Sequence, residues 1–334
     1  MKHPAPLSED ALIETFFAPL AGEGGLRLRD DAALLRPPPG CEIVLTKDLL
    51  VAGVHFFNDD SPAAIARKAL RVNLSDLAAK AAEPLGFLLG LALPAEWTAE
   101  WLKSFAAGLG EDAANYHCPL LGGDTVRTPG PLTISITAVG AVEAHKMVPR
   151  DGVKAGDRIY VTGTIGDAAL GLKLRLGASA DQDWIGALSE ADARFLQGRY
   201  LLPQPRLVLR DALKAFANAA MDVSDGLAGD LGKMLRLAGM SATIEVADIP
   251  LSGAARRALK AAPRLIEAIC AGGDDYELLC AVSPAKAASF EAAAAATGIG
   301  VSRLGAASAG EGAPAFVDAG GEAIHFARTS FQHF

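Results

Sequence analysis

The sequence predicts a two-domain α/β protein. Its 334 residues exceed the size at which a single hydrophobic core usually stops growing, about 250–300 residues. Apolar runs with strand character alternate with segments of helical periodicity along the whole chain, which is the pattern of α/β folds. Residues 145–157 are polar, basic and rich in turn residues, as expected of a connection between domains. We therefore expect domains at residues 1–150 and 151–334.

The first domain is expected to begin with a helix from Ser8 to Leu20, with Ser8 as its N-cap and acidic residues in its first turn. Strands are expected where short apolar runs are bounded by polar or turn residues, and helices where the apolar period is longer. In order, these are strands at 42–48 and 51–57, a helix at 62–82, a strand at 86–93, a helix at 96–115, a turn at 122–125 and a strand at 132–142.

The second domain should open with a strand at 158–162, the loop Gly163–Gly166 and a helix from Asp167. The loop lies between a strand and a helix and could hold an anion on its amides, but it lacks the GxGxxG spacing, so a plain tight turn is the favoured interpretation. The remaining elements are expected as helices at 186–199 and 206–216, a helix opened by Met221–Gly226, a strand at 242–246, helices up to Ile269, a strand at 276–282, and a final helix with strands.

Composition excludes several classes of protein. A formal charge of -8 and a pI near 5.3 argue against a general nucleic-acid or anionic-membrane surface. The four cysteines form no CxxC pair, which disfavours a zinc ribbon and a disulfide scaffold. The longest apolar run, Leu85–Leu93, is too short to span a bilayer, and acidic residues interrupt the N-terminal segment where a signal-peptide core would lie. We expect a cytoplasmic protein with reduced thiols.

The helix predicted at 62–82 holds Asp76 in a fixed position. Ile65, Leu70, Leu74, Leu77 and Ala81 recur at helical spacing, so Asp76 and Lys80 share another face. An exposed Asp76–Lys80 pair worth about 0.3 kcal/mol is the alternative to a functional role. Other acidic residues lie at or near the ends of predicted strands: Asp30, Asp31, Asp48, Asp124, Asp222, Asp225, Asp274 and Asp275. Carboxylates brought together in this way repel unless cations lie between them, which predicts a multi-metal phosphate site.

Motif searching narrows the chemistry. The chain has no GxxxxGK[ST], HExxH or GxSxG, which excludes a P-loop kinase and gives no support to a metalloprotease or serine hydrolase. Two acidic, glycine-containing motifs remain, Asp222-Val-Ser-Asp-Gly226 and Gly272-Gly-Asp-Asp275. A single cap explains one polar residue at a helix start but not two aspartates, so we expect contact with metal or phosphate at these motifs.

At these motifs the chain resembles the thiamine-monophosphate kinase family, in the PurM-like (aminoimidazole-ribonucleotide-synthetase-like) superfamily. The matching segments occur in order along essentially the whole chain: Asp30-Asp31, Asp48–Phe56, Val72–Ala79, Gly122–Thr125, Met221–Leu227, Gly273–Leu278 and the terminal His333-Phe334. The resemblance implies a two-domain PurM-like fold that forms a homodimer through its N-terminal sheets. It implies transfer of the γ-phosphate of ATP to thiamine monophosphate, with several Mg²⁺ ions. Strands that are apolar on both faces, such as 85–93 and 132–142, agree with a paired sheet.

The resemblance also implies roles for individual residues. Phosphoryl transfer needs charge neutralisation and alignment more than a covalent catalyst, so no general base or nucleophile is expected. The metal ligands would be Asp31, Thr46, Asp48, Asp76, Asp124, Asp222 and Asp225. ATP would contact Gly123, Arg150 and Ser224, and the thiamine phosphate would contact His55, Asp274 and Phe331.

The chain departs from the family pattern at five positions, which carry Arg29, Lys47, Ala52, Asp274 and Phe331. A lysine beside a metal ligand could crowd one ion, so Arg29 and Lys47 keep open a catalytically inactive nucleotide- or metal-binding regulator. Another ATP-using enzyme of the superfamily is the second alternative. The reactive cysteine that such enzymes would need, near the N-terminus or at the C-terminus, is absent.

Overall fold

The computed structural model describes residues 8–310, 312 and 314–331. The chain divides into two compact units, which are described separately: an N-terminal unit of residues up to Leu77 plus Ala82–His145, and a C-terminal unit of Ala78–Ala81 plus the residues from Lys146 onward. The division at residues 145 and 146 falls at the start of the polar segment expected to connect two domains. The terminal His333-Phe334 match lies outside the described residues.

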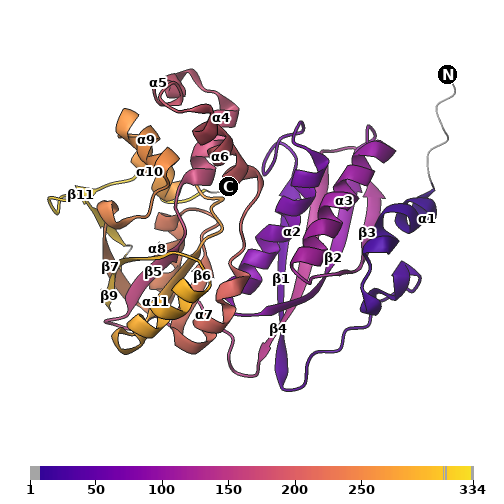
Figure 1. The fold of residues 1–334 in the computed structure, drawn as a ribbon, viewed down its shortest axis with the longest axis horizontal. Helices are drawn as coiled ribbons and strands as arrows, with labels where there is room; N and C mark the ends of the chain where they lie inside the picture. The colour runs from indigo at the N-terminus through magenta and orange to yellow at the C-terminus, as the bar shows by residue number, and fades with distance from the viewer. Residues whose placement is uncertain (1–7, 311, 313, 332–334) are drawn as a thin grey trace. The chain divides into compact units, whose positions relative to one another are not determined.

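The described part of the N-terminal unit is built on a four-stranded sheet of order β1-β4-β2-β3. Its strands are β1 (Cys41–Val51), β2 (Glu83–Leu93), β3 (Leu120–Arg127) and β4 (Thr133–Glu143). Strand β4 pairs antiparallel with β1 and β2, whereas β3 pairs parallel with β2. Helices α2 (Pro62–Ala79) and α3 (Ala99–Asn115) lie across one face of this sheet (Figure 1).

The N-terminal helical segment matches its prediction. Ser8 caps helix α1 (Glu9–Leu12), and its side chain accepts a hydrogen bond from the Ala11 amide at 3.3 Å. A π-helical turn and a 3-10 turn continue it as η1 (Ile13–Phe17) and η2 (Ala18–Leu20), and a further 3-10 segment, η3, covers Glu23–Leu28.

The two faces of the sheet differ because successive strand residues point to opposite sides. On the face toward the helices, Val44, Leu50, Ile136 and Leu89 are buried. The opposite, open face carries large apolar side chains that are 40–65% exposed, namely Ile43, Leu45, Leu49, Leu88 and Val126. We call these five residues the apolar open face.

Two predictions in this unit were wrong. Residues 51–57 do not form a second strand: β1 ends at Val51, and the chain turns at Gly53, whose φ is +81°. Residues 122–125 lie inside strand β3 rather than in a turn. Gly123 lies so close to β2 that a Cβ there would be 1.9 Å from the Leu89 carbonyl oxygen. The glycine pair therefore permits close strand contact, a use of glycine that resembles a turn signal in sequence.

The described residues of the C-terminal unit form a seven-stranded sheet of order β11-β10-β7-β9-β5-β8-β6. The strands are β5 (Arg158–Thr162), β6 (Ala217–Asp222), β7 (Met240–Glu245), β8 (Leu278–Val282), β9 (Val301–Ala309), β10 (Ala315–Val317) and β11 (Ala323–Ile324). The α-helices are α4 (Asp167–Leu176), α5 (Gln182–Ile185), α6 (Glu190–Leu201), α7 (Arg210–Phe216), α8 (Leu227–Ala238), α9 (Gly253–Ala261), α10 (Leu265–Ala271) and α11 (Ala287–Ala296).

Both faces of this sheet are buried. Ile159 and Val161 of β5 pack into a core with residues of α4, α6, α8, α9 and α10, whereas Tyr160 between them packs with Phe290 of α11 and residues of α7. Strand β6 was not predicted, because its sequence Ala-Asn-Ala-Ala-Met-Asp has little strand propensity. Burial between two helical layers decides its conformation instead.

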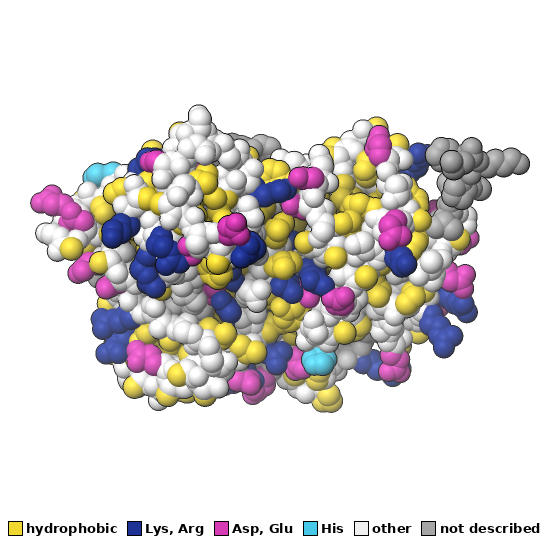
Figure 2. Space-filling view, turned by 45° about the horizontal axis from the view of Figure 1, so that its top comes forward, with side chains coloured by type: hydrophobic (Ala, Val, Ile, Leu, Met, Phe, Trp, Pro, Cys, Tyr) yellow, Lys and Arg dark blue, Asp and Glu magenta, His cyan; other side chains and the backbone are white. Residues whose placement is uncertain are grey.

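Charges are mixed on the surface. On the face shown in Figure 2, basic and acidic side chains are interspersed, in keeping with the formal charge of -8. None of the helices described in either unit combines the length and hydropathy needed to cross a membrane.

Candidate functional site

Asp76 of α2 faces strand β1 in the N-terminal unit. Helix α2 begins at Pro62, where a missing amide costs nothing, and its Asp76 is half-buried rather than exposed. The Thr46 hydroxyl donates a hydrogen bond to Asp76 Oδ2. Lys80 donates to the carbonyl oxygens of Ala220, at 2.7 Å, and Val148 within the C-terminal unit. Two predicted metal ligands, Thr46 and Asp76, are therefore in contact.

Strand alternation places Asp48 on the same face as Thr46 and turns Lys47 to the other face. Asp48 is opposite Ile136 in the β1–β4 ladder, and Ile136 is fully buried under the helices. Lys47 is exposed on the open face. Its ammonium group thus points away from Thr46 and Asp48, which removes the crowding expected from this departure. Arg29, the other cationic departure, pairs with Glu14 at 3.2 Å on the surface.

Asp124 and Asp31 are not brought to this group. The register pairs Leu89 with Gly123, so Gly123 shares the face of Asp48 and Asp124 projects from the open face. Asp31 is exposed in the bend that follows η3. Their roles as metal ligands, and that of Gly123 at ATP, stay predictions.

His55 is held in a tight turn that follows β1. Its Nδ1 accepts a hydrogen bond from the Val51 amide at 3.0 Å, so a neutral ring carries its proton on Nε2. The buried Lys68 of α2 donates to the His55 carbonyl oxygen at 2.9 Å and fixes the turn to the helix. These two hydrogen bonds therefore hold His55 in a fixed position beside α2.

The C-terminal unit brings together four of the predicted residues. The extended segment after β6 forms backbone hydrogen bonds with two other segments: Asp274 N to Ser224 O at 2.8 Å, Tyr276 N to Val223 O at 2.9 Å, and Phe331 N to Asp225 O at 2.9 Å. Ser224, Asp225, Asp274 and Phe331 therefore lie side by side, although Asp225 and Phe331 are 106 positions apart in the sequence. Asp222 is buried at the end of β6.

Two residues beside Asp225 were missed. Lys233 of α8 forms ion pairs with Asp225 and, at 2.9 Å, with the fully buried Asp230. Burial raises the pKa of Asp230 even though Asp230 pairs with Lys233. Burial by itself lowers the pKa of Lys233, but the hydrogen bonds of Lys233 to Asp225 and Asp230 outweigh this effect and raise its pKa. The spacing of Asp230 and Lys233 on a helix was a readable signal of their pairing. The Lys233 ammonium group is therefore in direct contact with the Asp225 carboxylate.

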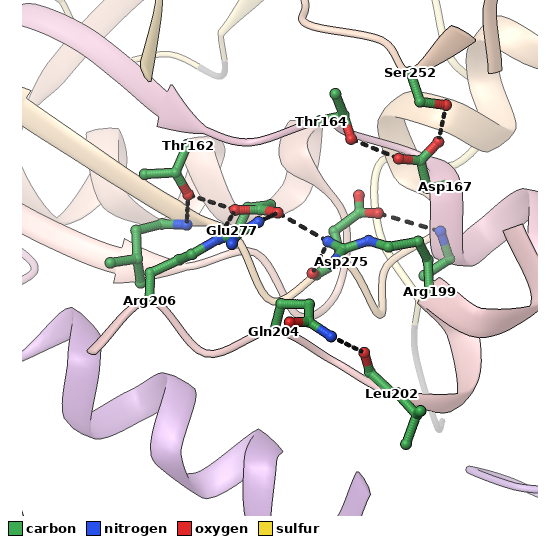
Figure 3. Close-up of polar contacts among 12 residues, drawn as sticks. Thr162, Thr164, Asp167, Arg199, Leu202, Gln204, Arg206, Ser252, Asp275 and Glu277 are labelled. Carbon is green, nitrogen blue, oxygen red and sulfur yellow. Dashed lines mark hydrogen bonds and ion pairs between the residues drawn. The ribbon is translucent and has the colours of Figure 1, made fainter. Parts of the chain in front are cut away.

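Asp275, which follows Asp274 in the chain, belongs to a buried polar cluster (Figure 3). Asp275 accepts hydrogen bonds from the Gly166 amide at 2.8 Å and the Ala168 amide at 3.4 Å. Burial raises the pKa of Asp275 well above its usual value. The amides at the start of α4 are therefore taken by a side chain of the protein. This favours the tight-turn interpretation of Gly163–Gly166 over an anion site.

The donor set suits Mg²⁺ chemically. Hydroxyl and carboxylate oxygens are the ligands that Mg²⁺ prefers, and Thr46, Asp48, Asp76, Asp222 and Asp225 supply only these. Over the described ranges, no three His, Cys, Asp or Glu side chains converge closely enough to form a metal site.

Arg150, the residue predicted to contact ATP, is exposed in the C-terminal unit. A cavity of about 400 Å³ near Phe56, Trp97 and Trp101 is lined by none of the predicted site residues.

Comparison with known proteins covers both units. The N-terminal domain model of AIR synthase related proteins matches residues 29–142, and the C-terminal domain model matches residues 154–318. The thiamine-monophosphate kinase of Caulobacter vibrioides is 45% identical over 294 residues, which span 87% of this chain and 81% of that protein. The thiamine-monophosphate kinase of Escherichia coli K12 is 42% identical over 76% of this chain and 75% of that protein.

Solved structures agree. Thiamine-monophosphate kinase from Stenotrophomonas maltophilia is 38% identical with a TM-score of 0.78, covering 89% of this chain and 91% of that one. The structure of AaThiL complexed with AMPPCP and TMP is 28% identical with a TM-score of 0.76, covering 100% of this chain and 99% of that one. The hydrogenase maturation protein HypE in complex with ATP is 17% identical with a TM-score of 0.76, covering 97% of this chain and 95% of that one, and it shares the fold alone.

Proposed function

This chain belongs to the AIR synthase related family and, within it, to the thiamine-monophosphate kinases, and from this we propose that it phosphorylates thiamine monophosphate. It transfers the γ-phosphate of ATP to this acceptor and forms thiamine diphosphate and ADP, in thiamine diphosphate biosynthesis. The observation that carries the proposal is the backbone pairing that holds Ser224, Asp225, Asp274 and Phe331 side by side. Ser224, matched to an ATP contact, and Asp225, matched to a metal ligand, are thus neighbours of the acceptor positions Asp274 and Phe331 in the C-terminal unit.

An acceptor assay tests the proposal. Purified protein is incubated with ATP and Mg²⁺ and with either thiamine monophosphate or thiamine. We expect ADP and thiamine diphosphate from thiamine monophosphate, and no turnover with thiamine, which lacks the accepting phosphate. Equal turnover with thiamine, or no product from either, would contradict the assignment.

Each group of residues has a distinct role in this proposal. Gly123, Arg150 and Ser224 contact ATP. His55 donates its Nε2–H to the acceptor phosphate. The carboxylate of Asp274 and the ring of Phe331, which is 48% exposed, face the cationic aromatic portion of the acceptor.

Mg²⁺ would be held by the oxygen donors of Thr46, Asp48, Asp76, Asp222 and Asp225. Asp31 and Asp124, which the structure does not bring to Thr46 and Asp76, are not assigned to this group. When bound, Mg²⁺ neutralises phosphate charge that the acidic side chains alone would repel. Lys233 forms an ion pair with Asp225, so metal binding there would compete with this ion pair.

The transfer is direct. The acceptor phosphate is already ionised near neutral pH, so no general base is required. Burial raises the pKa of Cys118, Cys270 and Cys280 to about 12, which leaves these thiols without nucleophilic character. The protein's contribution is to align the two phosphates.

The apolar open face supports a homodimer. Leu45 is 65% exposed and Leu49 is 52% exposed, and they share one face with Ile43, Leu88 and Val126. Exposed apolar patches of this kind mark interaction surfaces. Two such sheets would cover each other, with Lys47 and Asp124 at the same interface.

The use of ATP and the free state of all four cysteines support a cytoplasmic location.

A further inference from the structure

We propose that Glu277, clamped by Arg199 and Arg206, is a positioning residue for the acceptor. The inference rests on the proposed function, because it assigns a task to Asp274 within that site. Glu277 holds the turn of residues 273–276 in the conformation that presents the Asp274 carboxylate. We call Glu277, Arg199 and Arg206 the carboxylate clamp.

In the clamp, both carboxylate oxygens of Glu277 accept hydrogen bonds from surrounding side chains (Figure 3). Glu277 is completely buried. Its Oε2 accepts from Thr162 Oγ1 at 2.6 Å and from Arg206 Nε at 2.7 Å, and its Oε1 accepts from Arg199 Nη2 at 2.8 Å and from Arg206 Nη2. Charge-assisted bonds of this kind are stronger than neutral ones and fix geometry. The Glu277 side chain is therefore immobilised from three directions.

The clamp connects directly to the proposed site through the backbone. The Glu277 carbonyl oxygen accepts from the Val223 amide at 2.8 Å, and this is the first rung of the pairing that continues to Tyr276 and Asp274. Arg199 also reaches the Asp275 carbonyl oxygen at 3.4 Å. A shift of Glu277 would therefore move Asp274 relative to Ser224.

The turn needs such support because its backbone is strained. Gly273, Asp274 and Tyr276 have φ values of +75°, +65° and +49°. For residues with a Cβ, such as Asp274 and Tyr276, a left-handed conformation is unfavourable. Strain of this kind persists only where the surroundings over-determine the conformation, and it concentrates at functional sites. Asp275, bonded to the Gly166 amide, anchors the middle of the turn from the other side.

Stability alone does not account for the clamp. Buried ion triads can often be replaced by apolar side chains of similar volume with no loss of stability. The clamp instead specifies one conformation of the turn. This gives a test that separates positioning from a general contribution to the fold.

The test compares the wild type with Glu277→Gln and with a triple variant, Arg199→Met, Arg206→Met and Glu277→Met. Glu277→Gln replaces one carboxylate oxygen by an NH₂ group, which cannot accept hydrogen bonds from Arg199 and Arg206. The triple variant removes the carboxylate and both guanidinium groups, so no buried charge is left in the clamp. The matched control is Arg257→Met, which breaks an ion pair with Asp192 elsewhere in the same unit. Arg206→Lys, which keeps the charge but loses the Nε bond, carries the test if the stronger variants do not fold.

Two readouts are measured. Hydrogen exchange reports the amides of Asp274 and Tyr276, and steady-state kinetics reports KM for thiamine monophosphate and for ATP separately. We expect exchange to rise about tenfold or more in the clamp variants. KM for thiamine monophosphate should rise about tenfold while KM for ATP stays within about twofold. The control should change neither.

The proposal would be overturned if the amides of Asp274 and Tyr276 exchanged as slowly in the triple variant as in the wild type. It would also be overturned if KM for thiamine monophosphate and KM for ATP rose equally. The exchange readout does not depend on turnover. If the wild type failed to phosphorylate thiamine monophosphate, the proposed function would fall, while exchange would still decide whether the clamp holds the turn.

Discussion

Replacing Gly226 by alanine should disrupt the proposed site from a position that carries no functional group. Gly226 is the N-cap of helix α8, with φ of +114° and ψ of 140°, a conformation that residues with a Cβ rarely adopt. A Cβ at this position would lie 2.6 Å from the carbonyl carbon of Ala271. The chain would have to separate α8 from the end of α10, and Asp225 would move with it.

The expected cost follows from two effects. The unfavourable backbone conformation costs about 1–3 kcal/mol, and the steric overlap adds about 1–3 kcal/mol, so the free energy of unfolding should fall by about 4 kcal/mol. Gly239 provides the control because it ends the same helix with φ of +64° and has no atom within 4 Å of a Cβ. Gly239→Ala should cost only about 1 kcal/mol, the strain of one left-handed residue.

Urea unfolding followed by circular dichroism measures both variants, and the acceptor assay gives their kcat/KM. We expect Gly226→Ala to lose most activity and Gly239→Ala to keep it. If Gly226→Ala were no less stable than Gly239→Ala, the close approach of α8 to Ala271 would be wrong. If it were unstable but fully active, the link between Gly226 and the position of Asp225 would be wrong.

Three further results are expected. Asp76→Asn and Asp225→Asn should each lower kcat at least about a hundredfold without unfolding the protein, because a neutral amide binds Mg²⁺ poorly; near-normal turnover at limiting Mg²⁺ would refute the ligand role. Leu45→Glu should convert a dimer into a monomer in sedimentation, whereas Leu237→Glu, at another exposed leucine, should not; a monomeric, fully active wild type would remove the dimer proposal. Chirally labelled γ-phosphate should arrive on thiamine diphosphate with inverted configuration, as one in-line displacement requires, and retention would indicate a phosphoenzyme.

Local patterns were enough to predict most elements of this chain. The period of apolar residues placed α2, and strand β5 has the predicted bounds 158–162. Ser8 was identified as a cap because side-chain capping depends on neighbours only three residues away. The acidic glycine motifs identified the family because they recur in order along the chain.

Long-range pairing decided the rest. Gly122–Thr125 has the composition of a turn but forms a strand because β2 lies beside it, and β6 is a strand because helices cover both faces of its sheet. The bonds of Glu277 to Arg206, Arg199 and Thr162 span 71, 78 and 115 residues. No periodicity or motif encodes such partners. The sequence alone therefore determined the elements, the family and the candidate residues, whereas only the tertiary structure decided which side chains hold Asp274 in place, because contacts between distant segments form only when the chain packs.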